Sequence, residues 1–103
     1  MTINIQFVKL TPSESQSEFV TKKLQKISKK YEWVIHTEVF LKLENDPAER
    51  GHICEMDVSL PGPKIFASSH EKNFEKAVKK TISEIESQLK KRKAKFTTQN
   101  ISS

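Results

Sequence analysis

The sequence predicts a two-layer α+β sandwich in which two helices cover one face of a four-stranded sheet. Four short segments alternate apolar and polar residues, and two longer segments repeat apolar residues every three or four positions. The segments follow one another in the order β-α-β-β-β-α. Each helical segment has a single apolar stripe, and the inner face of the sheet supplies the apolar surface that both stripes need.

The first strand and the first helix are predicted over residues 2–31. Residues 2–8 alternate apolar and polar side chains, which indicates a half-buried strand. Thr11 suits a helix cap, Pro12 the first helical position, and Glu14 completes a capping box. The apolar stripe of the helix is formed by Val20, Leu24, Ile27 and Tyr31.

Three further strands are predicted next. Residues 34–44 and 52–60 alternate again, and the turn-forming residues 45–51 join them as a hairpin loop. After the turn at residues 61–63, residues 64–68 form a short strand. The core side of the third strand is predicted to hold Cys54, Met56, Val58 and Leu60.

The second helix is predicted to open at Ser68 with Glu71, or at Ser69, and to reach Lys95. We therefore expect one domain over residues 1–96 and a short polar tail, frayed, over residues 97–103. The apolar stripe of this helix is formed by Phe74, Val78, Ile82, Ile85 and Leu89, with Ala77 beside it.

Positive charge is concentrated on the two helices. Residues 19–31 hold five lysines and no acidic residue, and residues 63–103 hold ten Lys and Arg against four Asp and Glu. Residues 1–62 hold eight against nine, so the formal charge of +5 understates the local field. Clustered lysine on a folded frame is typical of proteins that bind a phosphate backbone, and equally of a solvated surface. Lysine binds phosphate as a point charge, so a lysine-rich surface favours reading of backbone and shape over base-specific contacts.

Several stretches are similar to one known family. They are the Thr11-Pro12 helix start, the basic segment 22–27, the stretch 67–78 and the close 86–95, ESQLKKRKAK. Together with the element order, they resemble the short ribosome hibernation-promoting factors, also called ribosome-associated inhibitor or sigma-54 modulation proteins. The resemblance covers residues 2–95.

The resemblance implies a fold like that of double-stranded RNA-binding domains with an extra strand. It implies a translation inhibitor, not an enzyme, that binds rRNA of the small ribosomal subunit in the mRNA and tRNA channel. Because the chain shows no second, dimerising domain like that of long members, we expect a monomer off the ribosome that does not join ribosomes by itself. The rRNA-facing residues that carry over by position are Lys22, Lys23, Lys26, Lys29, Lys79, Lys90, Lys91, Arg92, Lys93 and Lys95.

Two other functions stay open from the residues. One is a generic double-stranded RNA-binding domain. The other is a protein-interaction module on the open face of the sheet, where Phe40, Ile53 and Phe66 form a small apolar patch among Glu38, Lys42, Glu55 and Asp57.

We expect no cofactor, no metal, no membrane contact and no small-molecule substrate. His52 and Cys54 share a strand face, and His36 and His70 are the other candidate ligands, but no paired-cysteine motif accompanies them. A single cysteine and the lack of a long apolar run or leader peptide favour the cytoplasm. Tyr31 and Trp33 are expected to seal the core, with base stacking as the alternative.

Overall fold

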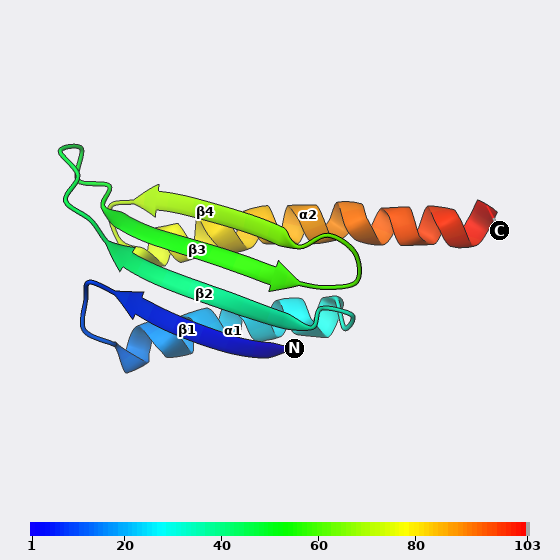
Figure 1. Cartoon of the computed structure of the whole chain (residues 1–103), viewed down its shortest axis with the longest axis horizontal. Helices are drawn as coiled ribbons and strands as arrows, with labels where there is room; N and C mark the ends of the chain where they lie inside the picture. Colours follow the sequence, from blue (N-terminus) through cyan, green and yellow to red (C-terminus); the bar gives the residue numbers. More distant parts are fainter. Residues whose placement is uncertain (103) are drawn as a thin grey trace.

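The computed structural model describes residues 1–102, and for residues 97–102 the backbone alone. Six elements follow in the predicted order: β1 (Thr2–Val8), α1 (Glu14–Lys30), β2 (His36–Leu43), β3 (His52–Ser59), β4 (Ile65–Glu71) and α2 (Phe74–Ser102). The strands form one sheet, and both helices lie against the same face of it (Figure 1). The predicted fold class is confirmed.

The strands lie in the sheet in the order β1-β2-β3-β4, so β1 and β4 are its edges. β1 runs parallel to β2 because α1 carries the chain back between them, whereas β2, β3 and β4 pair antiparallel through short connections. The register sets Ile5 beside Val39, Val39 beside Met56, and Met56 beside Ala67. This row and its neighbours on the same face form the apolar floor under the helices.

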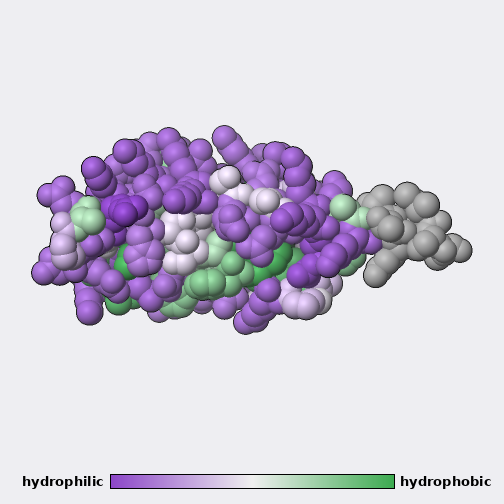
Figure 2. All heavy atoms as spheres, turned by 90° about the horizontal axis from the view of Figure 1, so that it is seen from above, coloured by the Kyte–Doolittle hydropathy of each residue, from purple (hydrophilic) through white to green (hydrophobic). Residues whose placement is uncertain are grey.

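The core lies between the sheet and the two helices. The predicted stripes of both helices are buried, with Leu24 of α1 and Ile85 of α2 fully inaccessible to solvent. The helices run in the same direction, with α1 behind β1 and β2 and α2 behind β3 and β4 (Figure 1). In a side view, hydrophobic side chains appear as a band between hydrophilic ones (Figure 2). The lysines of both helices are therefore left on the outside of the helical layer.

The first helix begins two residues later than predicted. Its N-cap is Ser13, whose Oγ accepts a hydrogen bond from the N–H of Gln16 at 3.3 Å. The sequence contains two overlapping capping signals, Thr11 with Glu14 and Ser13 with Gln16, and the second is the one that the helix uses. The helix ends at Lys30, and the N–H of Tyr31 closes it by donating to the Ile27 carbonyl at 2.8 Å.

The predicted capping box at Ser68 was wrong, as was its alternative at Ser69. β4 continues to Glu71, and α2 begins at Phe74 after Asn73, whose Oδ1 accepts from the N–H of Lys76 at 2.8 Å. The longer strand has a physical reason, because β3 offers backbone partners as far as His52, which pairs with Glu71. Residues 65–70 also alternate strictly between buried and exposed, which is the period of a strand.

The far end of α2 also differs from the prediction. The backbone of α2 stays helical to Ser102, beyond the expected end at Lys95. The side chains of residues 97–103 lie outside the described residues, so the domain boundary placed after residue 96 stays a prediction. At about 1.5 Å per residue, the 29-residue helix is about 43 Å long. It projects past the sheet and past the end of α1 (Figure 1).

The open face of the sheet is more divided than the sequence indicated. Ile53 is buried, whereas Phe66 is 55% exposed. The register pairs Phe40 with Glu55, Phe66 with Asp57 and Ile53 with Lys42, so a charged residue adjoins each of the three apolar side chains. They do not form one continuous apolar patch.

Candidate nucleic-acid interface

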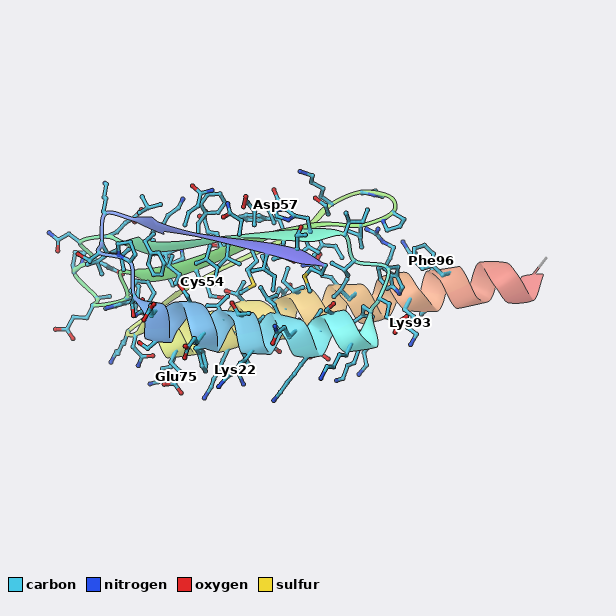
Figure 3. All side chains as sticks on the ribbon, turned by 90° about the horizontal axis from the view of Figure 1, so that it is seen from below. Lys22, Cys54, Asp57, Glu75, Lys93 and Phe96 are labelled. Carbon is cyan, nitrogen blue, oxygen red and sulfur yellow. The ribbon has the colours of Figure 1, made fainter. Side chains whose placement is uncertain are left out.

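The lysines of α1 lie opposite its buried stripe. Lys22, Lys26 and Lys29 are exposed, whereas Lys23 is partly covered and its ammonium lies 5.5 Å from the centre of the Phe19 ring. The helical period produces this arrangement, since Val20, Leu24 and Ile27 take the face toward the sheet. Lys22 points away from the sheet, as does Glu75 of the neighbouring helix (Figure 3).

A groove runs between the two helices. Its walls are formed by Lys23, Lys26, Ile27, Lys29, Lys30, Ile82 and Glu86. Four lysines of α1 thus line one side, and the apolar floor is the seam where the two helices meet. We call this surface the inter-helix groove.

The basic residues of α2 do not share one face. Lys79 and Lys90 stand seven and four residues from Glu86, so they lie on the side of α2 that borders the inter-helix groove. Lys91 and Lys95 instead border a second hollow beside β4. Its other lining residues are Ile65, Glu84, Gln88 and Arg92. We call this second surface the β4 flank.

The structure therefore does not bring the ten predicted residues together on one surface. Lys23, Lys26 and Lys29 line the inter-helix groove, with Lys79 and Lys90 on the adjoining side of α2. Lys22 lies on another side of α1, in a hollow that it shares with Glu18, and Lys91 and Lys95 stand on the β4 flank. Lys93 lies beside the residue that follows α1, with its ammonium 5.9 Å from the centre of the Tyr31 ring. The sequence alone treated residues 90–95 as one cluster, although a helix spreads six consecutive residues around its axis.

An ion pair crosses the inter-helix groove. The Lys30 Nζ lies 2.9 Å from Glu86 Oε2, and the hydrogen bond to this carboxylate raises the pKa of Lys30 above its ordinary value. Lys79 also has a carboxylate partner, because its Nζ lies 3.1 Å from Glu75 Oε1 one turn earlier. Both pairs are exposed, and such pairs contribute little to stability.

Most of the other predicted residues are not neutralised in this way. Within residues 1–96, eight of the ten form no ion pair within 4.0 Å: Lys22, Lys23, Lys26, Lys29, Lys90, Lys91, Arg92 and Lys95. An exposed ammonium without an acidic neighbour retains its full attraction for an added anion. The helical layer is thus suited to bind a polyanion.

Arg92 differs from its lysine neighbours. Its Nη1 donates to the Pro61 carbonyl at 3.0 Å, and its Nη2 donates to the Pro63 carbonyl at 2.9 Å. It is half-buried over the turn that joins β3 to β4. Sequence reasoning placed Arg92 among the rRNA contacts and missed these bonds, although the turn sequence Pro-Gly-Pro leaves carbonyls that need donors.

Two further residues of this surface were missed. Lys30 lines the groove but was not among the predicted contacts, and Glu86 places a negative charge there. Their spacing of 56 residues gives no local signal. Only the parallel packing of the helices brings the two side chains together.

The aromatic residues after α1 pack as the core interpretation predicts. Tyr31 is only 4% exposed, and its ring meets the edge of Trp33 at 5.8 Å between centroids. Trp33 is half-buried and also meets Phe96 of α2 edge-on at 5.3 Å. Both neighbours contact Trp33 from within the chain, which favours packing over base stacking.

The candidate metal ligands have other environments. Cys54 is fully buried between the layers, and burial raises the pKa of its thiol to about 12 (Figure 3). His52 lies edge-on against Phe74 at 4.8 Å between centroids, and His36 interacts with Thr2 and Glu38. Among the described residues, no three His, Cys, Asp or Glu side chains come together in a way that suits a metal ion. No helix in that part of the chain is long and apolar enough to cross a membrane.

Comparison with known proteins finds chains of similar sequence pattern and similar fold. The family model described as sigma 54 modulation protein / S30EA ribosomal protein matches residues 3–97. A ribosomal subunit interface protein from Coxiella burnetii has a similar fold, with a TM-score of 0.79 and 24% identity over 91% of this chain and 99% of that one. The N-terminal domain of Protein Y from Thermus thermophilus is also similar, with a TM-score of 0.75 and 22% identity over 88% and 98% of the two chains. No curated protein matches significantly by sequence.

Proposed function

The chain belongs to the sigma-54 modulation and S30EA ribosomal protein family, the ribosome-associated hibernation factors that its sequence resembles, and from this premise we propose that it binds rRNA of the small subunit. The proposed site is the channel for mRNA and tRNA. Binding there by the two basic helices prevents entry of both RNAs and keeps the ribosome inactive. The protein acts in the cytoplasm, as a monomer off the ribosome and without a cofactor.

The strongest support for this proposal is the set of lysines on the helical layer that have no acidic partner. They lie on the outer side of α1, along the inter-helix groove and on the β4 flank. RNA presents phosphates in rows, and each lysine that approaches a phosphate releases condensed counterions. Two separate lysine surfaces suit contact with more than one RNA strand, as a folded rRNA provides.

Lysine chemistry also limits what the surface reads. An ammonium binds phosphate without a fixed geometry, whereas base recognition commonly uses the planar fork of arginine. Arg92 is the only arginine on α2, and it already donates to two carbonyls. The nine lysines of the predicted set therefore recognise the shape and backbone of RNA, with little dependence on base sequence.

Sedimentation of the full chain with ribosomes tests this proposal. We expect the protein to move with the small subunit and with whole ribosomes at low salt, and to be released as salt rises. Protein that stays at the top of the gradient at low salt would contradict ribosome binding. Equal affinity for free duplex RNA would support a generic duplex-binding domain, whereas salt-resistant binding to a protein would support an interface on the open face of the sheet.

A translation assay tests the location. Added in excess over ribosomes, the protein should inhibit cell-free synthesis, because the occupied channel excludes mRNA and tRNA. The inhibition should fall when mRNA and tRNA are raised, since they compete for the same space. Demonstrated binding with unchanged synthesis would place the protein elsewhere on the subunit.

A further inference from the structure

The end of α2 carries positive charges that repel one another. Leu89 is the last residue of the buried stripe, and the helix continues for 13 residues beyond it. Residues 90–95 contain five basic side chains. Like charges three or four residues apart destabilise a helix, and short helical segments hold poorly without tertiary packing. Some contact beyond Leu89 must therefore hold this segment in place.

Arg92 supplies one such contact. Its guanidinium spans the two carbonyls of Pro61 and Pro63, on either side of Gly62. Gly62 has a φ of 91°, which favours glycine, and a Cβ added there would lie 3.1 Å from Arg92 Nη1. The turn and the guanidinium thus fit closely. This contact joins α2 to the connection between β3 and β4.

Phe96 supplies the second contact, one turn later. Its ring lies edge-on to Trp33, and Trp33 lies edge-on to Tyr31, which is buried at the end of α1. Phe96 and Lys93 reach the end of α1, whereas Arg92 reaches the turn after β3. The segment is therefore held by two connections of the fold (Figure 3 labels Lys93 and Phe96).

We propose that Arg92 is a positioning residue that, together with the Trp33–Phe96 contact, fixes the basic end of α2 for binding RNA. The inference rests on the proposed function. Lys90, Lys91 and Lys95 contact phosphate, and Arg92 holds them in position by its bonds to the turn. A guanidinium suits this task because its rigid fork donates to two acceptors at once, which a lysine ammonium does not reproduce.

Substitution of Arg92 by lysine distinguishes a positioning role from a direct phosphate contact, because it retains the charge and removes the fork. We expect Arg92→Lys and Arg92→Ala to weaken binding to the small subunit similarly, by about three- to tenfold, the factor that about one net hydrogen bond contributes. Neither should flatten the slope of log K against log salt. Lys91→Ala is the matched control, and it should flatten that slope by about 0.7–0.9.

Amide hydrogen exchange of the free protein gives a second measurement that does not depend on RNA. Arg92→Lys and Phe96→Ala should both speed exchange at Gly62 and Lys64 or in residues 89–96, while exchange in β2 and β3 stays slow. Lys91→Ala should leave both regions unchanged. Binding and exchange like those of the wild type in Arg92→Lys, with a flattened slope in Arg92→Ala, would overturn the inference and make Arg92 a phosphate contact. Failure of the wild type to bind the subunit would contradict the proposed function alone, because exchange still tests whether Arg92 and Phe96 hold the end of α2.

Discussion

The two outer surfaces of the sandwich differ in whether their lysines have acidic partners. On the open face of the sheet, Lys42 Nζ lies 2.9 Å from Glu55, and Lys64 Nζ lies 3.9 Å from Asp57. On the helical layer, most of the predicted lysines have no acidic partner among residues 1–96. The number of lysines alone therefore does not identify a binding surface. The informative feature is whether a neighbouring carboxylate already neutralises each one.

The difference follows from the two kinds of secondary structure. In an antiparallel pair, long side chains also reach diagonal neighbours on the next strand, so Lys42, which is opposite Ile53, contacts Glu55 two positions further along β3. A helix brings together residues three or four positions apart, and residues 19–31 contain no acid to pair with their lysines. The sheet thus neutralises its own charge, whereas the two acids of α1, Glu14 and Glu18, lie near its N-terminal end and form no ion pair with its lysines among residues 1–96.

The largest expected effect tests why α1 turns its lysines outward. Leu24 is fully buried in the core. Leu24→Ala should lower the free energy of unfolding by about 2–5 kcal/mol, a large part of what so small a domain has. Lys22→Ala, on the opposite side of the same helix, should change it by no more than about 0.5 kcal/mol. Denaturant unfolding monitored by circular dichroism measures both, and similar losses in the two variants would contradict this division of α1.

The two-layer fold and the buried side of each helix and strand could be predicted from the sequence, because both follow from the periodicity of apolar residues within a local stretch. The stripes of α1 and α2 and the inner side of β3 are buried as predicted. The start of α2 was wrong, because Ser68 resembles a cap locally but is held in β4 by pairing with Glu55. Pairing in the sheet depends on the tertiary fold, and here it overrides a local helix-capping signal.

The candidate site was less accessible to sequence reasoning. Which lysines lie outward follows from helical periodicity, and this much was predictable. Their grouping was not, because the inter-helix groove depends on how α1 and α2 pack. The bonds of Arg92 to the turn and of Lys30 to Glu86 span 29 to 56 residues of sequence, so no local pattern indicates them.

The next effect tests the unpaired lysines directly. Lys22→Ala with Lys26→Ala removes two cations from α1, and Lys91→Ala with Lys95→Ala removes two from the β4 flank. If all four contact phosphate, each pair should flatten the slope of log K against log salt by about 1.4–1.8 and weaken binding at low salt. Titration of labelled protein with small subunits at several salt concentrations measures this. An unchanged slope in one pair would remove that surface from the interface and leave the other.

A smaller effect of opposite sign is expected from the groove. Glu86 neutralises Lys30 across the inter-helix groove. Glu86→Gln keeps the shape of the side chain and frees the ammonium, so binding should strengthen and the slope should steepen by at most about 0.9, the value for one added contact. Glu44→Gln, which removes an exposed acid from the loop after β2, away from both lysine surfaces, is the matched control for the change in total charge. Equal strengthening in both variants would show that net charge acts, with no particular role for the groove.

The smallest expected effect is on the sheet, and it decides between the two surfaces. Lys42 already pairs with Glu55, and its ammonium lies 5.7 Å from the centre of the Phe40 ring. Lys42→Ala removes one positive charge from the molecule, as each single helix substitution does, yet it should leave the salt slope unchanged. Stability should change by no more than about 1 kcal/mol, the usual upper value for a surface ion pair. If Lys42→Ala flattens the slope as much as a helix lysine does, the open face of the sheet binds RNA as well, because a neutralised lysine would then have released its acid to take a phosphate.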